Sequence, residues 1–477
     1  MTLQDNGGDT TTVSANGSFT FPTALASGGT YAVTVSNTSP NYYTCSVTNG
    51  SGSVAGANVT NVAVACSMVP QTAMSCGNAT SIGSGNVAPL VVDGFPCTAG
   101  GTAGDANTGN VPYIAVKICA PGSTTNCQII DHVLVDTGST GLRIASSALQ
   151  STLQPGNGLP AIAGRGTSTS LTECETYVDS YVYGPLVTAD VYIAGKLVQS
   201  ANMQVFGPSN YPVPNSCSSQ GGISTNTTQA FGANGLIGVS FELQDDALYY
   251  DCQNANLGGC TADNFYAGLP STVSQFSSDN NGVTISMPPV IAAGLSTPVV
   301  GTLTFGVNTQ ADNTPTASTI PIANNDIGEF AAQVGGTWYT AYLDSGTDIL
   351  YFNDPTDAAL EPLCPSSNAV NAGLYCPATT QSVPFTFANA GTTASVGSLT
   401  YQVANAIDVN TLTAMAFNNL AGPITTSSTL SDTTIAFGFS LFYGHNVYVL
   451  FDTKTAPGTG LGGTANSTVT GPIDTIQ

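Results

Sequence analysis

The sequence predicts an all-β protein whose main part is built from two related halves. Short runs of alternating apolar and polar residues, separated by Asn-Gly, Gly-Gly and Pro turns, are typical of strands, and long helical periods are few. Two near-matching segments, residues 133–139 (VLVDTGS) and 341–347 (AYLDSGT), each join an apolar strand to an Asp-containing turn. They lie in separate halves of a 477-residue chain, so we expect two lobes that each contribute one carboxylate.

The spacing of these patterns predicts five parts along the chain. Residues 1–67 predict a small β-sandwich module, which serves for spacing or attachment and begins in the middle of a strand, so we expect it to be truncated. Residues 68–107 are rich in Gly and Ala and predict a linker. We expect the first lobe at 108–315 and the second at 316–462, with the boundary where Asn, Thr and Pro cluster, and a flexible tail at 463–477.

The charge balance excludes several classes of partner. Only 7% of the residues are charged, yet the net charge is −23, because 28 Asp and Glu face 5 Lys and Arg. Without a basic patch the chain is not expected to bind nucleic acid or an anionic membrane surface. No apolar run reaches the roughly 18 residues of a membrane helix, so no transmembrane segment is expected. We expect a monomer.

The twelve cysteines predict disulfides and an oxidising compartment, because they fall mostly in close pairs. Proximity in sequence alone pairs them as Cys45/Cys66, Cys76/Cys97, Cys119/Cys127, Cys174/Cys217, Cys252/Cys260 and Cys364/Cys376. There is no Cys-x-x-Cys and there are only two His, so we expect neither a metal site nor a cofactor. We expect an exported protein, periplasmic, cell-surface or extracellular, whose signal sequence is missing from this chain.

The doubled motif resembles the pepsin family of two-lobed aspartic peptidases. In that family an apolar-apolar-Gly element threads behind each Asp-Thr/Ser-Gly loop, and both companions are present here at 235–239 (GLIGV) and 435–438 (IAFG). The resemblance covers roughly residues 108–462 and implies a two-lobed pepsin-like aspartic protease fold. The chain is also similar to exported bacterial proteins of unassigned function that share the run from Asp136 through Gly141-Leu142-Arg143.

The resemblance implies Asp136 and Asp344 as the catalytic pair. Two carboxylates held side by side share a proton and act as an acid/base couple on water, without a covalent intermediate. We expect a polypeptide substrate in extended conformation and activity at acid pH. The residues expected to support the pair hold the carboxylates through backbone N–H groups, bond their outer oxygens, or cross-link the loops: Thr137, Gly138, Ser139, Ser345, Gly346 and Thr347.

The likeness extends to the hairpin that covers the cleft in this family, with three departures. Tyr177 falls on the flap tyrosine, and Tyr181 and Tyr183 are rivals. Arg143 stands where a Trp is usual, Asp348 where a small hydroxyl residue is usual, and residues 178–180 are not Gly-rich. Pointing inward, Arg143 lowers the pKa of a nearby carboxylate and Asp348 raises it.

Two other functions remain open at this stage. One is a catalytically inactive pepsin-fold surface protein that binds a peptide or glycan, which the departures favour. The other is a structural cell-surface β protein, which fits the polar β modules but leaves the doubled Asp loops unexplained. Each Asp motif taken alone is also ordinary turn chemistry.

Overall fold

The computed structural model describes residues 2–13, 17–37, 43–68, 81–94, 109–220, 222–254, 256–315, 318–354, 358–360, 362–368, 371–410, 415–424, 433–464 and 466–477. Contacts within the chain divide it into two compact units, Met1–Thr72 and Ala73–Gln477. None of the helices in the described ranges has the length and apolar character needed to cross a membrane.

The first unit is made of short antiparallel strands. One sheet has the order β2-β1-β3-β5, and β4 pairs with β6. Leu3 and Val33 are buried, while most of the other described side chains of this unit are half-buried or exposed. Its strands are β1 (Thr2–Asp5), β2 (Asp9–Thr12), β3 (Thr30–Asn37), β4 (Tyr43–Thr48), β5 (Ser51–Ser53) and β6 (Ala63–Met68).

The second unit contains a long twisted sheet with the order β19-β18-β13-β14-β15-β10-β17-β9-β8-β7-β21-β20-β30-β33-β22, to which β16 adds beside β14. These strands are β7 (Val87–Val92), β8 (Tyr113–Cys119), β9 (Cys127–Asp136), β10 (Thr140–Ala145), β13 (Thr169–Thr176), β14 (Ser180–Ile193), β15 (Lys196–Phe206), β16 (Ile223–Ser224), β17 (Gly235–Val239), β18 (Leu248–Gln253), β19 (Asn256–Ala262), β20 (Gly282–Ser286), β21 (Val299–Phe305), β22 (Ile320–Ala323), β30 (Asn446–Leu450) and β33 (Ile473–Ile476).

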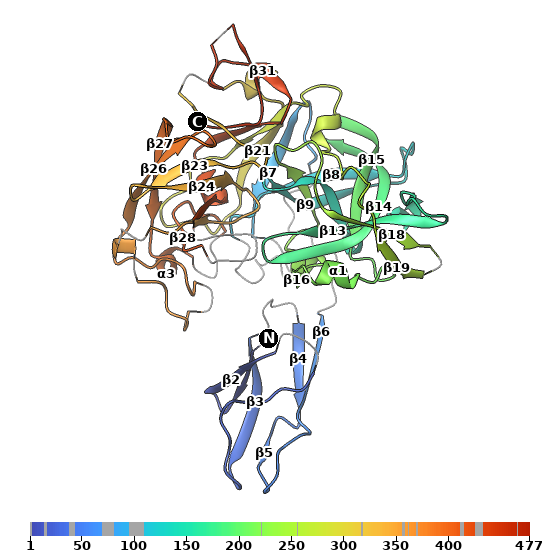
Figure 1. Ribbon diagram of the computed structural model, residues 1–477, viewed down its shortest axis with the longest axis vertical. Helices are drawn as coiled ribbons and strands as arrows, with labels where there is room; N and C mark the ends of the chain where they lie inside the picture. The colour runs from blue at the N-terminus through green and yellow to red at the C-terminus, as the bar shows by residue number, and fades with distance from the viewer. Residues whose placement is uncertain are drawn as a thin grey trace. The chain divides into compact units, whose positions relative to one another are not determined.

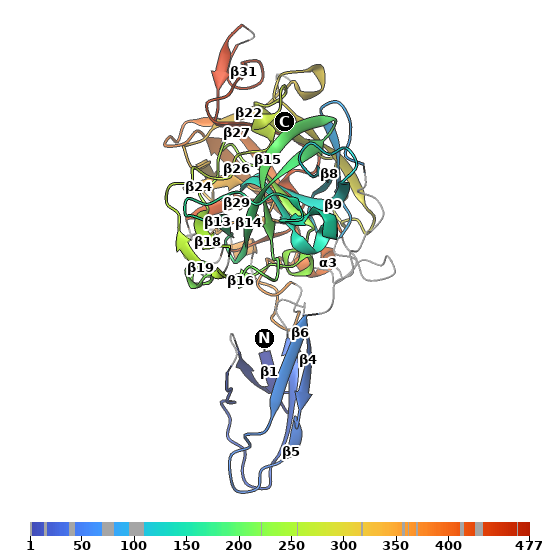
Figure 2. The same cartoon turned by 90° about the vertical axis from the view of Figure 1, so that its right-hand side faces the viewer.

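Another sheet in this unit has the order β27-β26-β23-β24-β29-β25-β28. Its strands are β23 (Phe330–Val334), β24 (Thr337–Leu343), β25 (Leu350–Tyr351), β26 (Gln381–Ala388), β27 (Ser395–Val403), β28 (Ala421–Gly422) and β29 (Thr434–Phe437). We call strands β8 to β19 the first lobe and strands β23 to β29 the second lobe. In Figure 1 the two lobes lie on opposite sides of β7 and β21, and in Figure 2 the strands of the first lobe lie in front of β24 and β26.

The remaining elements are short. Two small strand pairs are β11 (Gln154–Pro155) with β12 (Gly158–Leu159) and β31 (Thr455–Pro457) with β32 (Thr468–Thr470). The α-helices in the described residues are α1 (Asn215–Ser218), α2 (Thr228–Phe231) and α3 (Ala406–Val409). The 3-10 helices there are η1 (Ser146–Ala148), η2 (Ser151–Leu153), η3 (Val273–Gln275), η4 (Ala311–Asn313), η5 (Ala358–Leu360) and η6 (Phe439–Leu441).

The two lobes repeat one strand arrangement. In the first lobe β17 runs parallel to β9 and antiparallel to β10. In the second lobe β29 runs parallel to β24 and antiparallel to β25. The strand that ends in Asp136 and the strand that leads to Asp344 therefore occupy equivalent places. The all-β, two-lobed pepsin-like fold predicted from the sequence is confirmed.

Aromatic packing forms much of the core of the second lobe. Phe437 on β29 lies 5.2 Å from Phe385 and 5.4 Å from Phe387, measured between ring centroids, and its ring stacks on Phe330 at 6.1 Å. Burial of each ring contributes about 1.5–3 kcal/mol. This packing fixes β29 directly beneath the loop that carries Asp344.

Two expectations about the ends of the main domain are wrong. The segment 68–107 contains β7, which pairs with β21 along its whole length, so residues 87–92 belong to the sheet and are not a linker. The expected tail at 463–477 contains β33, whose four residues are buried between β30 and β22. Each run is short and pairs with strands far away in sequence, so local pattern reading misses it.

The end of β7 is also held by a buried ionic contact. Asp93 follows β7, and its Oδ2 lies 2.9 Å from Nε2 of His132 on β9. Asp131 lies 3.3 Å from the other ring nitrogen. Burial lowers the pKa of His132, but the hydrogen bonds and charges of Asp131 and Asp93 outweigh it and raise this pKa to about 9.

Four of the expected disulfides are present in the described residues, namely Cys119–Cys127, Cys174–Cys217, Cys252–Cys260 and Cys364–Cys376. The expected pairs Cys45/Cys66 and Cys76/Cys97 fall on side chains outside the described residues. The disulfides fit an oxidising compartment.

Candidate active site

The first Asp loop begins at Asp136, the last residue of β9. Oδ1 of Asp136 accepts a hydrogen bond from the backbone N–H of Gly138 at 2.8 Å. Its Oδ2 accepts one from the Ser139 hydroxyl at 2.5 Å. Asp136 is buried and Gly138 is exposed, so the carboxylate lies just below the surface of the loop.

The second Asp loop repeats these contacts atom for atom. Oδ1 of Asp344 accepts a hydrogen bond from the backbone N–H of Gly346 at 2.8 Å, and its Oδ2 accepts one from the Thr347 hydroxyl at 2.6 Å. Asp344 is half-buried, and Gly346 is exposed like Gly138. Each carboxylate is therefore held through both oxygens by its own loop.

The two loops are joined beneath the carboxylates by reciprocal hydrogen bonds. The backbone N–H of Thr137 donates to Oγ of Ser345 at 3.0 Å, and the backbone N–H of Ser345 donates to Oγ1 of Thr137 at 2.9 Å. Each hydroxyl then donates to a carbonyl of the opposite strand, from Thr137 to Leu343 at 3.1 Å and from Ser345 to Val135 at 2.7 Å. All four groups are buried, so this cross-link fixes the separation of the lobes at the site.

The two carboxylates lie against both glycines. A methyl group added to Gly138 would stand 2.8 Å from Oδ1 of Asp344 and 3.2 Å from Oδ1 of Asp136. A methyl group added to Gly346 would stand 2.6 Å from Oδ1 of Asp136 and 3.1 Å from Oδ1 of Asp344. Only glycine leaves room for this approach, and the Oδ1 atoms are the inner oxygens of the pair.

The pKa of Asp136 depends on its burial and on the nearby carboxyl group of Asp344. Burial, then the charge of Asp344, then a hydrogen bond with its carboxyl group raise the pKa of Asp136 well above its usual value. The bonds from Ser139 and Gly138 act in the opposite direction. A carboxyl group with this balance keeps a proton beyond the pH at which an ordinary aspartate loses it.

The two downstream glycine elements lie where the sequence predicts. A methyl group on Gly238 would stand 2.5 Å from the carbonyl oxygen of Ser139, and one on Gly438 would stand 2.8 Å from that of Thr347. Each element also binds its loop, because Ser240 N–H donates to Ser139 O at 2.9 Å and Phe439 N–H donates to Thr347 O at 2.7 Å. These glycines allow a strand to pass directly behind each Asp loop.

Asp348 lies beside the second loop but does not bond the pair. Its Oδ1 accepts a hydrogen bond from the backbone N–H of Ile349 at 2.9 Å and one from the Tyr351 hydroxyl at 3.4 Å. Burial raises the pKa of Asp348 to about 6, and the nearby charge of Asp344 adds a smaller effect of the same sign.

Arg143 lies in an acidic cluster that sequence reasoning missed. Its guanidinium pairs with Glu173, Glu175 and Asp245, and all four residues are buried. A signal existed in the Glu-Cys-Glu alternation of residues 173–175, just before Tyr177. In the described part of the chain these three acids are the group with the spacing of metal ligands, but Arg143 already binds an oxygen of each.

Tyr177 lies at the tip of the hairpin formed by β13 and β14, where its N–H donates to Ser180 O at 2.8 Å. Its ring packs 5.9 Å from that of Phe231. The hydroxyl is buried and finds no hydrogen-bond partner in the described part of the chain. Burial raises the pKa of Tyr177, the charge of Arg143 lowers it, and the charges of Glu175 and Asp136 raise it further.

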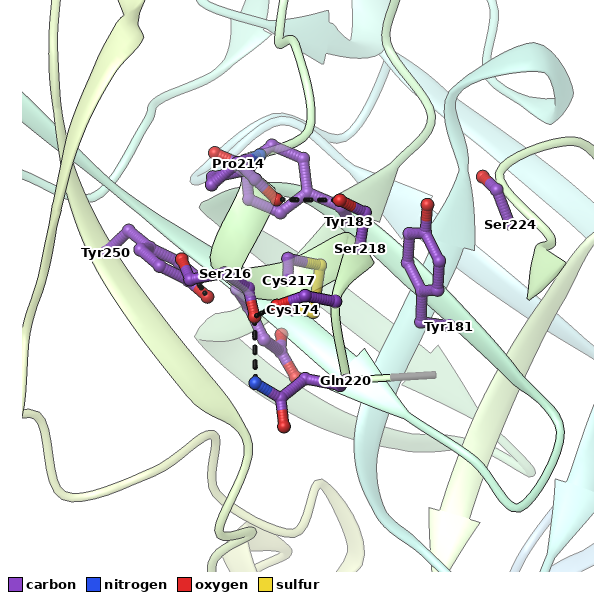
Figure 3. Close-up of a disulfide and its surroundings, with 12 residues drawn as sticks. Cys174, Tyr181, Tyr183, Pro214, Ser216, Cys217, Ser218, Gln220, Ser224 and Tyr250 are labelled. Carbon is purple, nitrogen blue, oxygen red and sulfur yellow. Dashed lines mark hydrogen bonds between the residues drawn. A yellow bond between two sulfur atoms is a disulfide. The ribbon is translucent and has the colours of Figure 1, made fainter. Parts of the chain in front are cut away.

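The rival tyrosines lie on the other side of the hairpin. Tyr181 and Tyr183 pack with the Cys174–Cys217 disulfide and Tyr250, as Figure 3 shows. The hydroxyl of Tyr183 lies 2.9 Å from that of Thr172. Tyr177 thus lies on the face of the hairpin opposite the disulfide, and the charge of Asp136 is one of the causes that raise its pKa.

Comparisons with known proteins give a family match and likenesses to solved structures. A search of curated protein sequences finds no match. Among solved structures, the chain is similar to the aspartic proteinase from Irpex lacteus, with 13% identity and a TM-score of 0.46 over 82% of this chain and 96% of that one. A family model described as "Protein of unknown function (DUF3443)" matches residues 84–465. The chain therefore belongs to this family of proteins of unknown function.

Proposed function

We propose that the protein is an aspartic endopeptidase that hydrolyses peptide bonds with a water activated between Asp136 and Asp344. The observation that carries the proposal is the doubled carboxylate arrangement, in which matched bonds from two loops hold the outer oxygens and leave the inner oxygens together. Such a pair works as an acid and a base at once, because one member is ionised while the other holds a proton.

The proposed reaction uses only these two side chains and water. The ionised carboxylate takes a proton from the water as its oxygen attacks the peptide carbonyl carbon, and the protonated carboxyl group gives its proton to the carbonyl oxygen. The carboxyl group that took the proton of the water then gives it to the amine nitrogen as the C–N bond breaks, and a hydroxyl of the tetrahedral intermediate returns a proton to the other carboxylate, so that the starting pair is restored. Ser139 and Thr347 bond the outer oxygens, while the two inner oxygens lie together between the loops, so we assign both proton transfers to the inner oxygens.

The substrate we propose is an extended polypeptide lying beneath the hairpin tip, paired through its backbone. Tyr177 would cover the substrate and exclude water from the pair. We further propose that the protein acts as a monomer after export and needs no cofactor. The disulfides in the described residues support export, because such bonds persist in oxidising compartments.

The geometry gives less support to the two rival functions. An inactive binding protein would need a residue that spoils the pair, but Arg143 pairs with the acidic cluster and Asp348 bonds within its own loop. A structural protein would not require Thr137 and Ser345 to cross-link the two Asp loops.

The proposal is tested by incubating the protein with an unfolded polypeptide at acid pH and mapping the products by mass spectrometry. New ends at internal peptide bonds, absent with Asp344→Asn, would support an endopeptidase. Binding of the polypeptide without cleavage, equal in wild type and variant, would support the inactive binding protein instead.

A further inference from the structure

Arg143 connects the Asp136 loop to the hairpin above it. Its Nη1 donates to the carbonyl oxygen of Thr140 at 2.6 Å, at the start of β10 and four residues after Asp136. Its Nη2 lies 2.5 Å from Oε1 of Glu173 and 3.0 Å from Oε2 of Glu175, and its Nε donates to Glu173 at 3.0 Å. Both glutamates belong to β13, the strand that leads to Tyr177.

Strand alternation explains why this contact controls Tyr177. Successive side chains of a strand point to opposite faces, so Glu173, Glu175 and the following Tyr177 lie on one face. The opposite face carries Cys174, which the Cys174–Cys217 disulfide joins to α1 (Figure 3). The strand is thus held on one face by hydrogen bonds from Arg143 and on the other by a covalent bond.

The tip of the hairpin is held as well. β16 adds beside β14, and Ile223 N–H donates to Asp179 O at 2.8 Å. At the base, the Gln204 side chain donates to Glu173 O at 2.8 Å. These contacts hold the hairpin in place at its tip and at its base. Residues 178–180 at the tip are Val-Asp-Ser and contain no glycine.

The cluster is costly to bury, which argues for a role beyond packing. Three carboxyl groups face one guanidinium, and burial raises the pKa of Glu173 well above its usual value and that of Glu175 to about 8. Packed apolar side chains in place of the whole cluster would avoid this cost, because replacing buried ion pairs by apolar groups is often neutral or stabilising, whereas removing Arg143 alone would leave three buried acids without their partner. The planar guanidinium group of Arg143 can do what an apolar side chain cannot: it donates directed hydrogen bonds to β10 and to β13 at the same time.

We propose that Arg143 is a positioning residue that sets the place of Tyr177 over the Asp pair, by tying β13 to the loop that follows Asp136. The inference rests on the proposed peptidase function. The buried hydroxyl of Tyr177 has no hydrogen-bond partner in the described residues, so it is available to donate to bound substrate. Arg143 acts through Tyr177 and does not touch the reacting atoms.

The test combines hydrogen–deuterium exchange with a kinetic double-mutant cycle. Arg143→Met keeps an unbranched side chain and removes the guanidinium group. Arg143→Lys keeps the positive charge without the planar set of N–H donors, and it replaces Arg143→Met in the test if that variant does not fold. We expect exchange at residues 176–181 to rise at least about tenfold in Arg143→Met and less in Arg143→Lys, with β26 and β27 unchanged. Arg165→Met is the matched control, because Arg165 lies over the exposed ring of Phe265, 4.2 Å from its centroid.

The cycle pairs Arg143→Met with Tyr177→Phe. Because Arg143 acts through Tyr177, we expect each variant to lower kcat/KM about tenfold, mainly through kcat, and the double variant to lose little more. Unchanged exchange at the tip, or losses that simply multiply, would overturn the role of Arg143 while leaving the peptidase intact. A folded wild type without cleavage would overturn the proposed function and this role with it.

Discussion

Thr137 and Ser345 exchange hydrogen bonds across the two lobes, each accepting the backbone N–H of the other through its side-chain hydroxyl. The contact is symmetric although the two residues differ, because both side chains end in a hydroxyl group at the same position of the motif. It makes the placement of the Asp pair a property of the joined loops rather than of either lobe alone.

Removing one hydroxyl from this contact should destabilise the protein. Ser345→Ala leaves the buried N–H of Thr137 and the carbonyl of Val135 without this partner, so we expect the free energy of unfolding to fall by about 1–3 kcal/mol. Denaturant unfolding measures the change. Ser382→Ala is the matched control, because Ser382 makes an exposed hydroxyl bond to Gln402. Equal small effects in both variants would contradict the account of the cross-link.

Removing the hydroxyl of Tyr177 should affect activity and not stability. Since this hydroxyl has no partner in the described residues, we expect Tyr177→Phe to change the free energy of unfolding by less than about 0.5 kcal/mol. We expect kcat/KM to fall about tenfold, the size of one hydrogen bond to substrate. Tyr181→Phe, on the disulfide side of the hairpin, should keep wild-type kinetics. If Tyr181→Phe lost more kcat/KM than Tyr177→Phe, Tyr181 and not Tyr177 would be the residue that covers the substrate.

The protein should be more stable at acid than at neutral pH. Burial raises the pKa of Glu175 to about 8 and that of Asp474 to about 7, so the folded state binds more protons than the unfolded state. The resulting stability is fully present below the unfolded pKa of about 4 and is lost as pH rises through the folded values. We therefore expect Tm to fall between about pH 4.5 and about pH 8.

Asp474→Asn isolates one part of this pH dependence. The folded and unfolded pKa values of Asp474 differ by an amount worth on the order of 4 kcal/mol at neutral pH and above. We expect the variant to gain stability over wild type as pH rises, with a flatter dependence of Tm on pH. Asp326→Asn removes a surface carboxyl group and controls for net charge. If Tm of Asp474→Asn fell with pH as steeply as that of the wild type, Asp474 would not be a cause of the pH dependence.

The Cys174–Cys217 disulfide should contribute more stability than Cys119–Cys127. The first joins residues 43 apart and the second residues 8 apart, so the first removes more freedom from the unfolded chain. Replacing both cysteines by Ser should cost about 4 kcal/mol for the first pair and about 2.5 kcal/mol for the second. Denaturant unfolding of the two double variants checks the order, and the reverse order would contradict it.

Much of the site was predictable because its chemistry is local in sequence. The bonds to Asp136 come from Gly138 and Ser139, and those to Asp344 come from Gly346 and Thr347, so one short motif contains each carboxylate with its supports. The downstream glycines were found for the same reason, since close passage behind a loop requires glycine.

The rest depends on contacts between distant residues. The partners of Arg143 come from β13 and from the loop before β18, and no local pattern joins residues 143, 173 and 245. β7 and β33 are short runs that become strands only by pairing with β21 and β30. Their positions follow from tertiary pairing, which strand propensity does not encode.

The central claim is tested most directly by the cleavage of an unfolded protein from about pH 3 to about pH 7 with wild type and Asp136→Asn. Asn has the shape of Asp but cannot exchange the proton, so we expect activity that peaks at acid pH in the wild type and falls at least about a thousandfold in the variant. No cleavage by folded wild type, or equal cleavage by the variant, would contradict the proposed mechanism.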